Sequence, residues 1–475
     1  MTSFSASHED WRVLSSIEQA SPRGYPRYLF PFELQDNYNL EEIVHVLKTG
    51  WDATCQRFPT LRAEVIPDHD AKQAGNLKLK ELDEDSLRDI KPIVVKDLRK
   101  PGEFPTFADL KSRHFPVSAL DENLLTRRYT WPAPGERIPI ILIQLNFIQG
   151  GLILNWNPFH VAGDGKTFYT WTEVWAQECR RAQNIAIENP VRLPDGIFAD
   201  RAHVMNPKAP GSSKKGRLED HPQYNVMTDP VNQLQKLLKP DGHVGQIFYF
   251  SEESLKRLKE DAYPYGLTDG EPSYISTNDA LSLLAWRSVM AAQFPIQDIE
   301  GDPITAFTLS VDGRYRLEPP INAGTLGCFL VFLEVKTSLQ KMLETEDVGH
   351  LAVLLRKAIL NANNYPGGFT NDMITLVDRL ENPALLVPGA FLDSPGLCCS
   401  QTTWAKFELF GLEWGPLLGN QIKAVRSPRC GIINGLQVVL PTLPDGGREV
   451  LFGIEERCLE RLLNDPLLRK YAEPR

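Results

Sequence analysis

The segment from His160 to Gly165 reads HVAGDG and places an imidazole and a carboxylate among small residues. When an alcohol attacks a thioester, its hydroxyl group must lose a proton. A neutral imidazole, whose ordinary pKa is about 6.5, can accept that proton at neutral pH. The sequence therefore predicts that His160 is a general base in acyl transfer to a hydroxyl group.

Two roles are open to Asp164. Its carboxylate can bond to His160 directly, as in a catalytic triad, or it can anchor the loop through an arginine. The glycine on each side of Asp164 makes a tight turn, which favours the loop anchor. Taken alone, a histidine near a strand end is more often a packed core or loop residue. The chain has nine histidines, so chance matches to a short motif are common.

Other catalytic motifs are absent from the sequence. It has no G-x-S-x-G nucleophile elbow, no H-E-x-x-H zinc motif and no G-x-x-x-x-G-K-[ST] phosphate loop. The G-D-G at residues 163–165 starts like a dinucleotide fingerprint, but Phe168 holds the third glycine position. Seven cysteines without a C-x-x-C pair predict reduced thiols rather than a metal site or a catalytic cysteine.

The elements around this segment are predicted to be a hairpin followed by a helix. Residues 138–148 and 152–156 are rich in β-branched and apolar side chains, and the Gln-Gly-Gly between them is a turn signal. After Gly165, apolar residues recur at helical spacing. They are Phe168, Trp171, Val174 and Trp175. His160 thus lies on a strand-to-helix connection, where rigid elements hold both ends of a loop that can carry chemistry.

The rest of the chain mixes helices and strands, so we expect an α/β fold. A helix is predicted over residues 40–57, and a second helix starts at Ser276–Asp279, because these side chains accept bonds from free N–H groups. A final helix is predicted to begin near Glu456. Strands are predicted at residues 61–66, 246–250, 307–311, 328–335, 431–440 and 449–454.

The composition indicates a globular protein of two domains. Of the 475 residues, 42% are hydrophobic and 24% are charged, and this length exceeds one ordinary core. Residues 206–221 are rich in Pro, Gly, Ser and Lys, so we predict domains 1–205 and 245–475 joined by a linker at 206–244. Basic residues of the linker could instead form a rim for cofactor phosphates. These residues are Lys214, Lys215 and Arg217.

Charge and hydropathy limit the expected partners and location. The net charge is −10 without a long basic run, so nucleic-acid binding is not expected. The N-terminus lacks the basic and apolar segments of a secretory signal. The longest apolar stretch, residues 138–145, is far below the ~18 residues that span a membrane. We therefore expect a cytoplasmic protein that is not inserted into a membrane.

Two further sets of residues follow the HVAGDG segment at wide spacing. The first is DGRYR at residues 312–316, followed by TLG at 325–327. The second is TTW at 402–404, followed by EWGP at 413–416. The order and spacing of the three sets resemble the BAHD acyltransferase superfamily, and within it the fungal O-acyltransferases of specialised metabolism. The resemblance extends from Trp11 to Leu467.

The family's H-x-x-x-D-G motif matches His160, Asp164 and Gly165. By this resemblance His160 is the general base, whereas Asp164 is structural and pairs with an arginine, either Arg314 or Arg316. The resemblance implies no covalent enzyme intermediate. The acceptor and the thioester instead meet at the histidine in a ternary complex.

The family's T-S-W and D-F-G-W-G motifs match less closely. Thr402 and Trp404 stand where the family's threonine and indole N–H face the developing oxyanion, and such fixed donors are worth about 3–4 kcal/mol each. Core packing explains Trp404 equally well. Glu413 and Gly415 stand in the second motif, where Asp has become Glu and the later Trp-Gly has become Pro-Leu. The carboxylate survives, so a salt bridge is still expected.

The resemblance places four residues on the cofactor side of the site. They are Ser276, Thr277, Asp312 and Gly327. Ser276 and Thr277 stand where the family often contacts the pantetheine arm of coenzyme A, although helix capping explains them equally well. The family's Gly-Asn after the arginine motif is Gly327-Cys328 here, which is a further departure.

The fold that the resemblance implies is two similar chloramphenicol-acetyltransferase-like α/β domains with an active-site tunnel between them. The implied co-substrate is acetyl-CoA or another acyl-CoA, with no tightly bound cofactor and no metal. The implied acceptor is a hydroxyl group of a hydrophobic secondary metabolite, such as a terpenoid or meroterpenoid. We expect the enzyme to act as a monomer.

Two alternatives stay open at this point. A condensation-type enzyme would form amides from carrier-bound donors, but such enzymes usually show His-His-x-x-x-Asp-Gly, and Phe159 holds the first position here. A catalytically silent binding protein could share the same fold, which the intact His160 and Asp164 disfavour.

Overall fold

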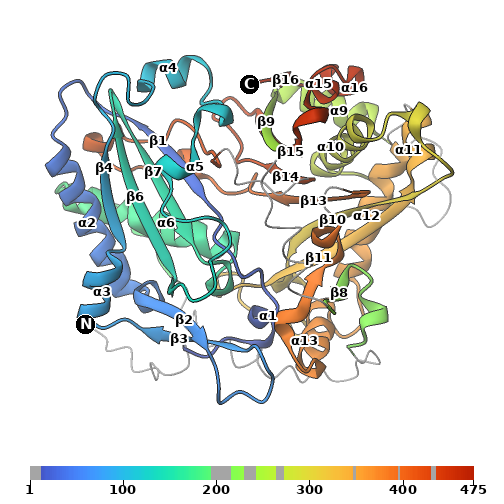
Figure 1. Ribbon diagram of the computed structural model, residues 1–475, viewed down its shortest axis with the longest axis horizontal. Coiled ribbons are helices and arrows are strands. Elements are labelled where there is room, and N and C mark those ends of the chain that lie inside the picture. The colour runs from blue at the N-terminus through green and yellow to red at the C-terminus, as the bar shows by residue number, and fades with distance from the viewer. Residues whose placement is uncertain are drawn as a thin grey trace.

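The computed structural model describes residues 12–193, 216–228, 242–263, 272–345, 349–393, 396–428 and 435–475. Two halves lie side by side in Figure 1, the N-terminal half in blue and green and the C-terminal half in yellow, orange and red. Helices and strands mix in both halves, so the predicted α/β class is confirmed. Most of the predicted linker, including Lys214 and Lys215, lies outside the described residues.

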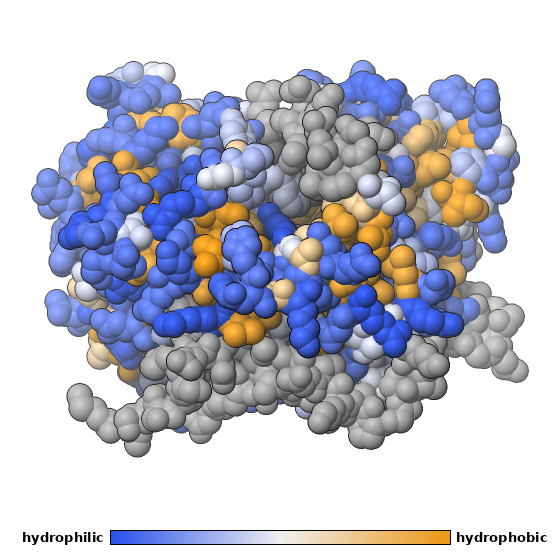
Figure 2. All heavy atoms as spheres, turned by 60° about the horizontal axis from the view of Figure 1, so that its bottom comes forward, coloured by the Kyte–Doolittle hydropathy of each residue, from blue (hydrophilic) through white to orange (hydrophobic). Residues whose placement is uncertain are grey.

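The surface that Figure 2 shows is mostly hydrophilic, with apolar residues gathered in separate patches. Large exposed apolar side chains come from distant parts of the chain. They include Val13, Val95, Tyr129, Ile304 and Tyr315. Among the described residues, no helix has both the length and the apolar character needed to cross a bilayer.

The N-terminal half is built on a four-stranded sheet in the order β1-β7-β6-β4. Its strands are β1 (Tyr28–Glu33), β4 (Ile93–Asp97), β6 (Ile141–Ile148) and β7 (Gly151–Pro158). The strands β6 and β7 form the predicted antiparallel hairpin, and every residue in both is buried. A fully buried hairpin gives a rigid support for the turn that follows Pro158.

The helix α2 (Leu40–Arg57) has the bounds that the sequence predicts, and it packs against α6 (Gly165–Ala182). The crossing is close at Gly50, where a Cβ would lie 2.7 Å from Sγ of Cys179. Trp51 of α2 and Trp175 of α6 meet edge to face, with ring centroids 5.3 Å apart. This contact fixes the position of α6, which directly follows Asp164.

Smaller elements surround the N-terminal sheet. A second sheet, in the order β3-β2-β5, contains β2 (Ala63–Pro67), β3 (Leu77–Glu81) and β5 (Ile138–Pro139). The short helices are α1 (Ser16–Gln19), α3 (Glu84–Ile90), α4 (Phe107–Ser112) and α5 (Glu122–Leu125). The strand predicted from residue 61 starts later, because Pro59–Arg62 forms a 3-10 turn before β2.

The C-terminal half is built on a seven-stranded sheet in the order β11-β10-β13-β14-β15-β9-β16. Its strands are β9 (His243–Phe250), β10 (Ile304–Asp312), β11 (Leu330–Ser338), β13 (Cys398–Thr403), β14 (Leu436–Val439), β15 (Arg448–Glu455) and β16 (Glu473–Pro474). Because β10 and β13 are parallel, Asp312 and Thr403 come to the same edge of the sheet. This edge therefore joins the arginine motif to the TTW motif.

Two predicted strands of this half start later than expected. The strand predicted from residue 328 begins at Leu330, because the backbone N–H groups of Cys328 and Phe329 donate to the carboxylates of Glu18 and Asp164 instead of to a strand. The strand predicted over 431–440 begins at Leu436. Its first four predicted residues lie outside the described part of the chain.

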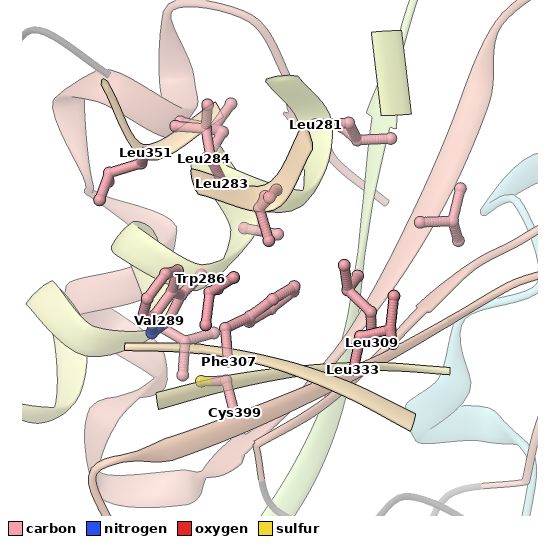
Figure 3. Packing of buried hydrophobic residues seen from close by; sticks show 14 of the residues in the cluster. Leu281, Leu283, Leu284, Trp286, Val289, Phe307, Leu309, Leu333, Leu351 and Cys399 are labelled. Atoms are coloured by element: carbon pink, nitrogen blue, oxygen red, sulfur yellow. The ribbon is translucent and has the colours of Figure 1, made fainter. Parts of the chain in front are cut away.

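The helix α10 (Thr277–Gln293) covers the large sheet. Trp286 of α10 stacks on Phe307 of β10 with ring centroids 5.3 Å apart, and its indole N–H donates to Oγ1 of Thr305 at 3.0 Å. Figure 3 shows this stack among the leucines of the cluster. The remaining elements are α9 (Glu252–Asp261), α11 (Leu339–Glu344), α12 (Gly349–Asn363), α13 (Phe369–Arg379), α14 (Gly389–Leu392), α15 (Leu459–Leu463), α16 (Pro466–Arg469), β8 (Tyr224–Val226) and β12 (Leu386–Pro388).

One segment of the C-terminal half crosses to the N-terminal sheet. Ile422 and Arg426 form isolated bridges to β1. The indole ring of Trp414 lies edge-on to Trp175 of α6, with centroids 5.3 Å apart. The two halves therefore share a hydrophobic cluster, and the division of the chain at residues 206–244 stays a proposal.

Candidate active site

His160 lies in a 3-10 turn, His160–Ala162, between the end of β7 and the start of α6. Its backbone N–H donates to the carbonyl oxygen of Gly24 at 2.9 Å, so the segment before β1 holds the turn in place. Gly163 continues the turn close to α6, where a Cβ would lie 2.7 Å from the side chain of Thr167. The tight turn therefore requires a glycine at this position.

His160 is a partly exposed residue. It meets Phe168 edge to face, with centroids 5.6 Å apart, and its Nδ1 lies 3.6 Å from Sγ of Cys328. Among the described residues no other side chain hydrogen-bonds to the ring, whereas the backbone of His160 and of Gly163 does. Burial lowers the pKa of His160 below its ordinary value, against the opposing effects of nearby backbone and of Asp164. The ring is therefore neutral at neutral pH.

The carboxylate of Asp164 faces Arg314 rather than His160. Nη1 of Arg314 lies 2.6 Å from Oδ2, and Nη2 lies 3.2 Å from Oδ1. The backbone N–H groups of Thr167 and Phe329 donate to the same carboxylate at 3.1 and 3.0 Å. Burial opposes ionisation, but Arg314 and these hydrogen bonds lower the pKa of Asp164. This geometry supports the loop anchor and not the triad.

The guanidinium of Arg314 is buried and surrounded by acceptors. Besides Asp164, it donates to the side chain of Asp312 at 3.0 Å and to the carbonyl oxygen of Gly327 at 3.1 Å. Arg316, the other arginine that the resemblance allowed, instead donates to the carbonyl oxygen of Asp312 at 2.8 Å. The ion pair with Asp164 therefore comes from Arg314.

Asp312 and Gly327, predicted on the cofactor side, both have structural partners. The side chain of Asp312 accepts from the backbone N–H of Arg314 at 2.9 Å. The backbone N–H of Gly327 donates to Oγ1 of Thr167 at 3.0 Å, and this hydroxyl donates back to its carbonyl at 2.8 Å. Gly327 has φ +136°, and a Cβ there would lie 2.6 Å from Oε1 of Glu18. These residues tie the arginine loop to α6, and their contact with coenzyme A stays a proposal.

Ser276 and Thr277 lie at the start of α10. Oγ of Ser276 accepts from the backbone N–H of Asp279 at 3.2 Å, and the Asp279 carboxylate accepts from the backbone N–H of Ser276 at 2.7 Å. This reciprocal pair is a capping box. The same carboxylate pairs with Arg356. Capping accounts for Ser276, and a role in cofactor binding stays a proposal.

Thr402 and Trp404 lie at the end of β13, at the sheet edge where β10 also ends. The ring of Trp404 packs on Tyr28 of β1, with centroids 4.7 Å apart. A narrow cavity of about 20 Å³ lies here, lined mainly by aromatic side chains from both halves. Its lining includes Tyr28, Phe30, Gly165, Phe168, Trp404 and Phe407. Because Phe168 also contacts His160, the cavity adjoins the imidazole.

Glu413 and Gly415 lie at the other end of α6 from the histidine. Oε2 of Glu413 is 3.0 Å from Nη1 of Arg180, in the last turn of the helix. Gly415 has φ +91°, and a Cβ there would lie 2.3 Å from the side-chain amide of Gln183. Nε2 of Gln183 also donates to the carbonyl oxygen before Gly415 at 2.7 Å. The EWG motif thus holds the far end of α6 and does not reach His160.

Sequence reasoning did not select Tyr28 and Cys328, although both lie at the site. Tyr28 is 7% exposed and lines the cavity, and its hydroxyl makes no hydrogen bond to the described residues. The only signal at Cys328 was its departure from the family's Gly-Asn. Tyr28 had no signal, because an aromatic residue in an apolar strand is ordinary core composition.

A larger cavity, of about 530 Å³, lies elsewhere, between residues 12–14 and β3, and contains none of the predicted site residues. Within the described ranges, no group of three His, Cys, Asp or Glu side chains is arranged to hold a metal ion. Cavity size therefore does not mark the site of chemistry in this molecule. The segments that meet around His160 and Asp164 make this turn the candidate site.

The two-half α/β fold, with a histidine on its strand-to-helix turn, defines a class of acyl-transferring enzymes. The Transferase family matches residues 107–415, and the trichothecene 3-O-acetyltransferase-like N-terminal domain matches residues 25–179. The chain belongs to the Transferase family. The predicted resemblance to fungal BAHD acyltransferases and the prediction of an acyltransferase are thereby confirmed.

Two curated relatives illustrate the similarity. Trichothecene 3-O-acetyltransferase TRI101 of Fusarium sporotrichioides is 26% identical over 455 residues, which cover 94% of this chain and 93% of that protein. Enoyl-CoA isomerase/hydratase claC of Penicillium crustosum is 27% identical over 477 residues, which cover 97% of this chain but 50% of that protein. The chain thus spans half the length of claC, whose name describes the longer protein.

A solved structure supports the fold. The crystal structure of F. graminearum TRI101 complexed with coenzyme A and deoxynivalenol has a TM-score of 0.80 at 22% identity. The match covers 98% of this chain and 99% of that one. The predicted two-domain fold is confirmed, and the tunnel between the halves stays a prediction.

Proposed function

We propose that this chain is an acyl-CoA-dependent O-acyltransferase that acetylates a hydroxyl group of a hydrophobic secondary metabolite. The observation that carries the proposal is the placement of His160, a partly exposed residue on the strand-to-helix turn, with no side chain bonded to its Nε2 among the described residues. The buried Asp164–Arg314 pair anchors the loop that holds the ring. A base held in one place suits removal of a proton from a bound alcohol.

The proposed reaction needs no covalent enzyme intermediate. Acyl-CoA and the alcohol bind together, and Nε2 of His160 takes the hydroxyl proton as the alcohol oxygen bonds to the thioester carbon. The tetrahedral oxyanion then collapses and the C–S bond breaks. The imidazolium returns its proton to the departing thiolate, so the enzyme ends the cycle unchanged.

Thr402 and Trp404 are proposed to stabilise the oxyanion. Both lie at the sheet edge that meets the N-terminal half, and Trp404 lines the cavity that adjoins Phe168 and His160. A fixed indole N–H or hydroxyl in this place would be worth about 3–4 kcal/mol to the transition state. The same residues would thereby link the C-terminal half to the chemistry.

Two observations support the proposed identities of the donor and the acceptor. The aromatic side chains that line the small cavity offer apolar contacts to an acceptor that binds against them. The relative named trichothecene 3-O-acetyltransferase favours acetyl-CoA as donor and a terpenoid as acceptor. We also propose a cytoplasmic location, because the six cysteines that the structure describes carry free thiols, as in a reducing compartment.

The test is to incubate the purified chain with acetyl-CoA and a panel of hydroxylated terpenoids and polyketides. We expect release of free coenzyme A and a mass gain of one acetyl group on at least one acceptor, and neither with His160→Ala. Turnover only with a carrier-linked donor would favour the condensation-type enzyme. Ligand binding without consumption of any thioester would favour the silent binding protein.

A further inference from the structure

A stack of two aromatic rings joins the two halves of the molecule near the proposed base. Tyr169 belongs to α6, and Phe407 belongs to the loop that follows Trp404 of the C-terminal half. The two ring centroids lie 5.6 Å apart, and the ring planes differ by 17°. Both rings line the narrow cavity that Tyr28, Phe168 and Trp404 also line.

The two stacked rings lie at the outer end of this cavity. Tyr169 and Phe407 are partly exposed, whereas Phe168 and Tyr28 are only 3% and 7% exposed. The ring of Phe168 also contacts the ring of His160. The stack therefore stands between solvent and the buried side chains next to the proposed base.

The cavity is too small for an acceptor while the rings are stacked. Its volume is about 20 Å³, which is room for about one water molecule. Pockets that bind drug-sized ligands have volumes of about 300–1,000 Å³. An alcohol that reaches His160 through this cavity must therefore displace at least one ring of the lining.

Of the two stacked rings, Phe407 is held less firmly. Tyr169 belongs to an 18-residue helix, and Nζ of Lys166 lies 5.5 Å from the centroid of its ring. Phe407 belongs to a turn in which its backbone N–H donates to the carbonyl oxygen of Trp404 at 2.9 Å. Its ring lies over Gly165, where a Cβ would come within 2.8 Å of Cε2. Since glycine has no side chain to interlock with the ring, Phe407 can rotate to another rotamer while α6 stays in place.

We propose that Phe407 is a specificity-determining residue that closes the path of the acceptor to His160. When an acceptor binds, the ring of Phe407 rotates away from Gly165 and Tyr169. An apolar part of the acceptor then takes the place of the ring against Tyr169, so the side chain at position 407 sets how bulky an acceptor can be. The proposal rests on the proposed function, in which an alcohol is brought to His160.

The first test compares the binding of two alcohols of different bulk to the full chain without acetyl-CoA. Calorimetric titration measures the affinity for benzyl alcohol, the small probe, and for 1-adamantanemethanol, the bulky probe. We expect Phe407→Ala to bind the bulky probe about tenfold more tightly than the wild type, because no ring has to be displaced, and Phe407→Trp to bind it more weakly. The affinity for benzyl alcohol should change less than about twofold. Equal affinities for the bulky probe, or no binding by any of the three proteins, would overturn the proposal.

The matched control is Phe410→Ala. Phe410 is a partly buried phenylalanine further along the same loop, and it does not line the cavity. Its removal should leave both affinities unchanged. A gain in Phe410→Ala equal to that in Phe407→Ala would mean that any opening in this loop admits the probe, and it would contradict the role of Phe407.

The movement of the ring gives a second readout, in the wild-type sequence. Every phenylalanine is labelled as 4-fluorophenylalanine, and Phe407→Leu identifies the fluorine-19 NMR signal of Phe407. When the bulky probe is bound, this signal should respond more strongly to exchange of light for heavy water, because the ring has turned into solvent. A Phe407 signal that the bound probe leaves unchanged would overturn the proposal.

These tests are distinguishable from a test of the proposed function. Binding and ring movement are measured without acetyl-CoA, so they are read whether or not acyl transfer occurs. Affinity changes at position 407 together with no acyl transfer to any alcohol would count against the function alone. Acyl transfer with identical acceptor preferences in the wild type, Phe407→Ala and Phe407→Trp would count against the role of Phe407 alone.

Discussion

The two ends of α6 each carry an arginine–carboxylate pair, and the two pairs differ in burial. At the N-terminal end the side chains of Arg314 and Asp164 are 1% and 9% exposed and meet through two hydrogen bonds. At the C-terminal end those of Arg180 and Glu413 are 27% and 57% exposed and meet at 3.0 Å. An α-helix rises about 1.5 Å per residue, so the 16 residues from Asp164 to Arg180 place the two pairs about 24 Å apart.

The difference separates the end of α6 that holds the proposed base from the end that supports the helix. Removing one partner of a buried pair leaves an uncompensated charge, which costs about 3–5 kcal/mol. An exposed pair is screened by water and contributes about 0–1 kcal/mol. At the C-terminal end the hydrogen bonds of the Gln183 amide to the backbone of Trp414 and Leu417 therefore hold the loop more than the ion pair does.

The largest expected effect is at the N-terminal end, in the base itself. We expect His160→Ala to lower kcat by about 10²- to 10⁴-fold, because no other group takes the hydroxyl proton. Affinity for coenzyme A should change little. Steady-state kinetics measure kcat, and calorimetric titration measures the affinity for coenzyme A. Wild-type turnover by His160→Ala would show that His160 is not the base.

Asp164→Ala should mainly reduce stability. The variant removes the more buried of the two carboxylates that pair with Arg314 and leaves only Asp312, so we expect the free energy of unfolding to fall by up to about 3–5 kcal/mol. Urea denaturation measures this change, with Glu413→Ala at the opposite end of α6 as the control. A variant of wild-type stability with only kcat reduced would instead support a His160–Asp164 dyad.

Trp404→Phe tests what the C-terminal half contributes near the base. The variant keeps an aromatic ring against Tyr28 but removes the indole N–H. If that N–H faces the oxyanion, kcat should fall about 10²-fold at unchanged thermal stability. Retention of full activity would show that packing alone explains Trp404.

The pH dependence of kcat/KM gives a reversible test of the proposed base, His160, at the N-terminal end of α6. The neutral ring is the active base, so kcat/KM should fall as the pH drops through the pKa of His160. Burial lowers that pKa below its ordinary value of 6.5, and the acidic limb is therefore expected below pH 6.5. The pKa of Asp164 is also lowered, so its ion pair with Arg314 persists through this range. A limb above pH 6.5 would indicate a stabilised imidazolium.

The smallest effect is expected at the C-terminal end of α6. Glu413→Gln should change the free energy of unfolding by less than about 1 kcal/mol, and high salt should remove the difference. Gly415→Ala should cost more than about 1 kcal/mol, because φ is +91° and the new methyl would meet Gln183. Thermal unfolding of both variants compares them, and the reverse order would mean that the ion pair holds the loop.

Local patterns predicted the local elements well. The helix over 40–57 has the bounds of α2, and the hairpin before His160 is present as β6 and β7. The strand predicted from Cys328 was wrong at its start, because Glu18 and Asp164 take the first two N–H groups. Both acceptors lie far from this strand in the chain, so no local pattern could show them.

By itself, the sequence determined the turn that presents His160 and the order of the three motifs. The turn depends on neighbouring residues, whose spacing and glycines act within a few bonds of one another. Only the tertiary structure decided that Arg314 meets Asp164, that Trp404 lies on Tyr28 and that a thiol faces Nδ1. Each of these contacts joins distant parts of the chain, and the packing of the two halves selects which side chains meet.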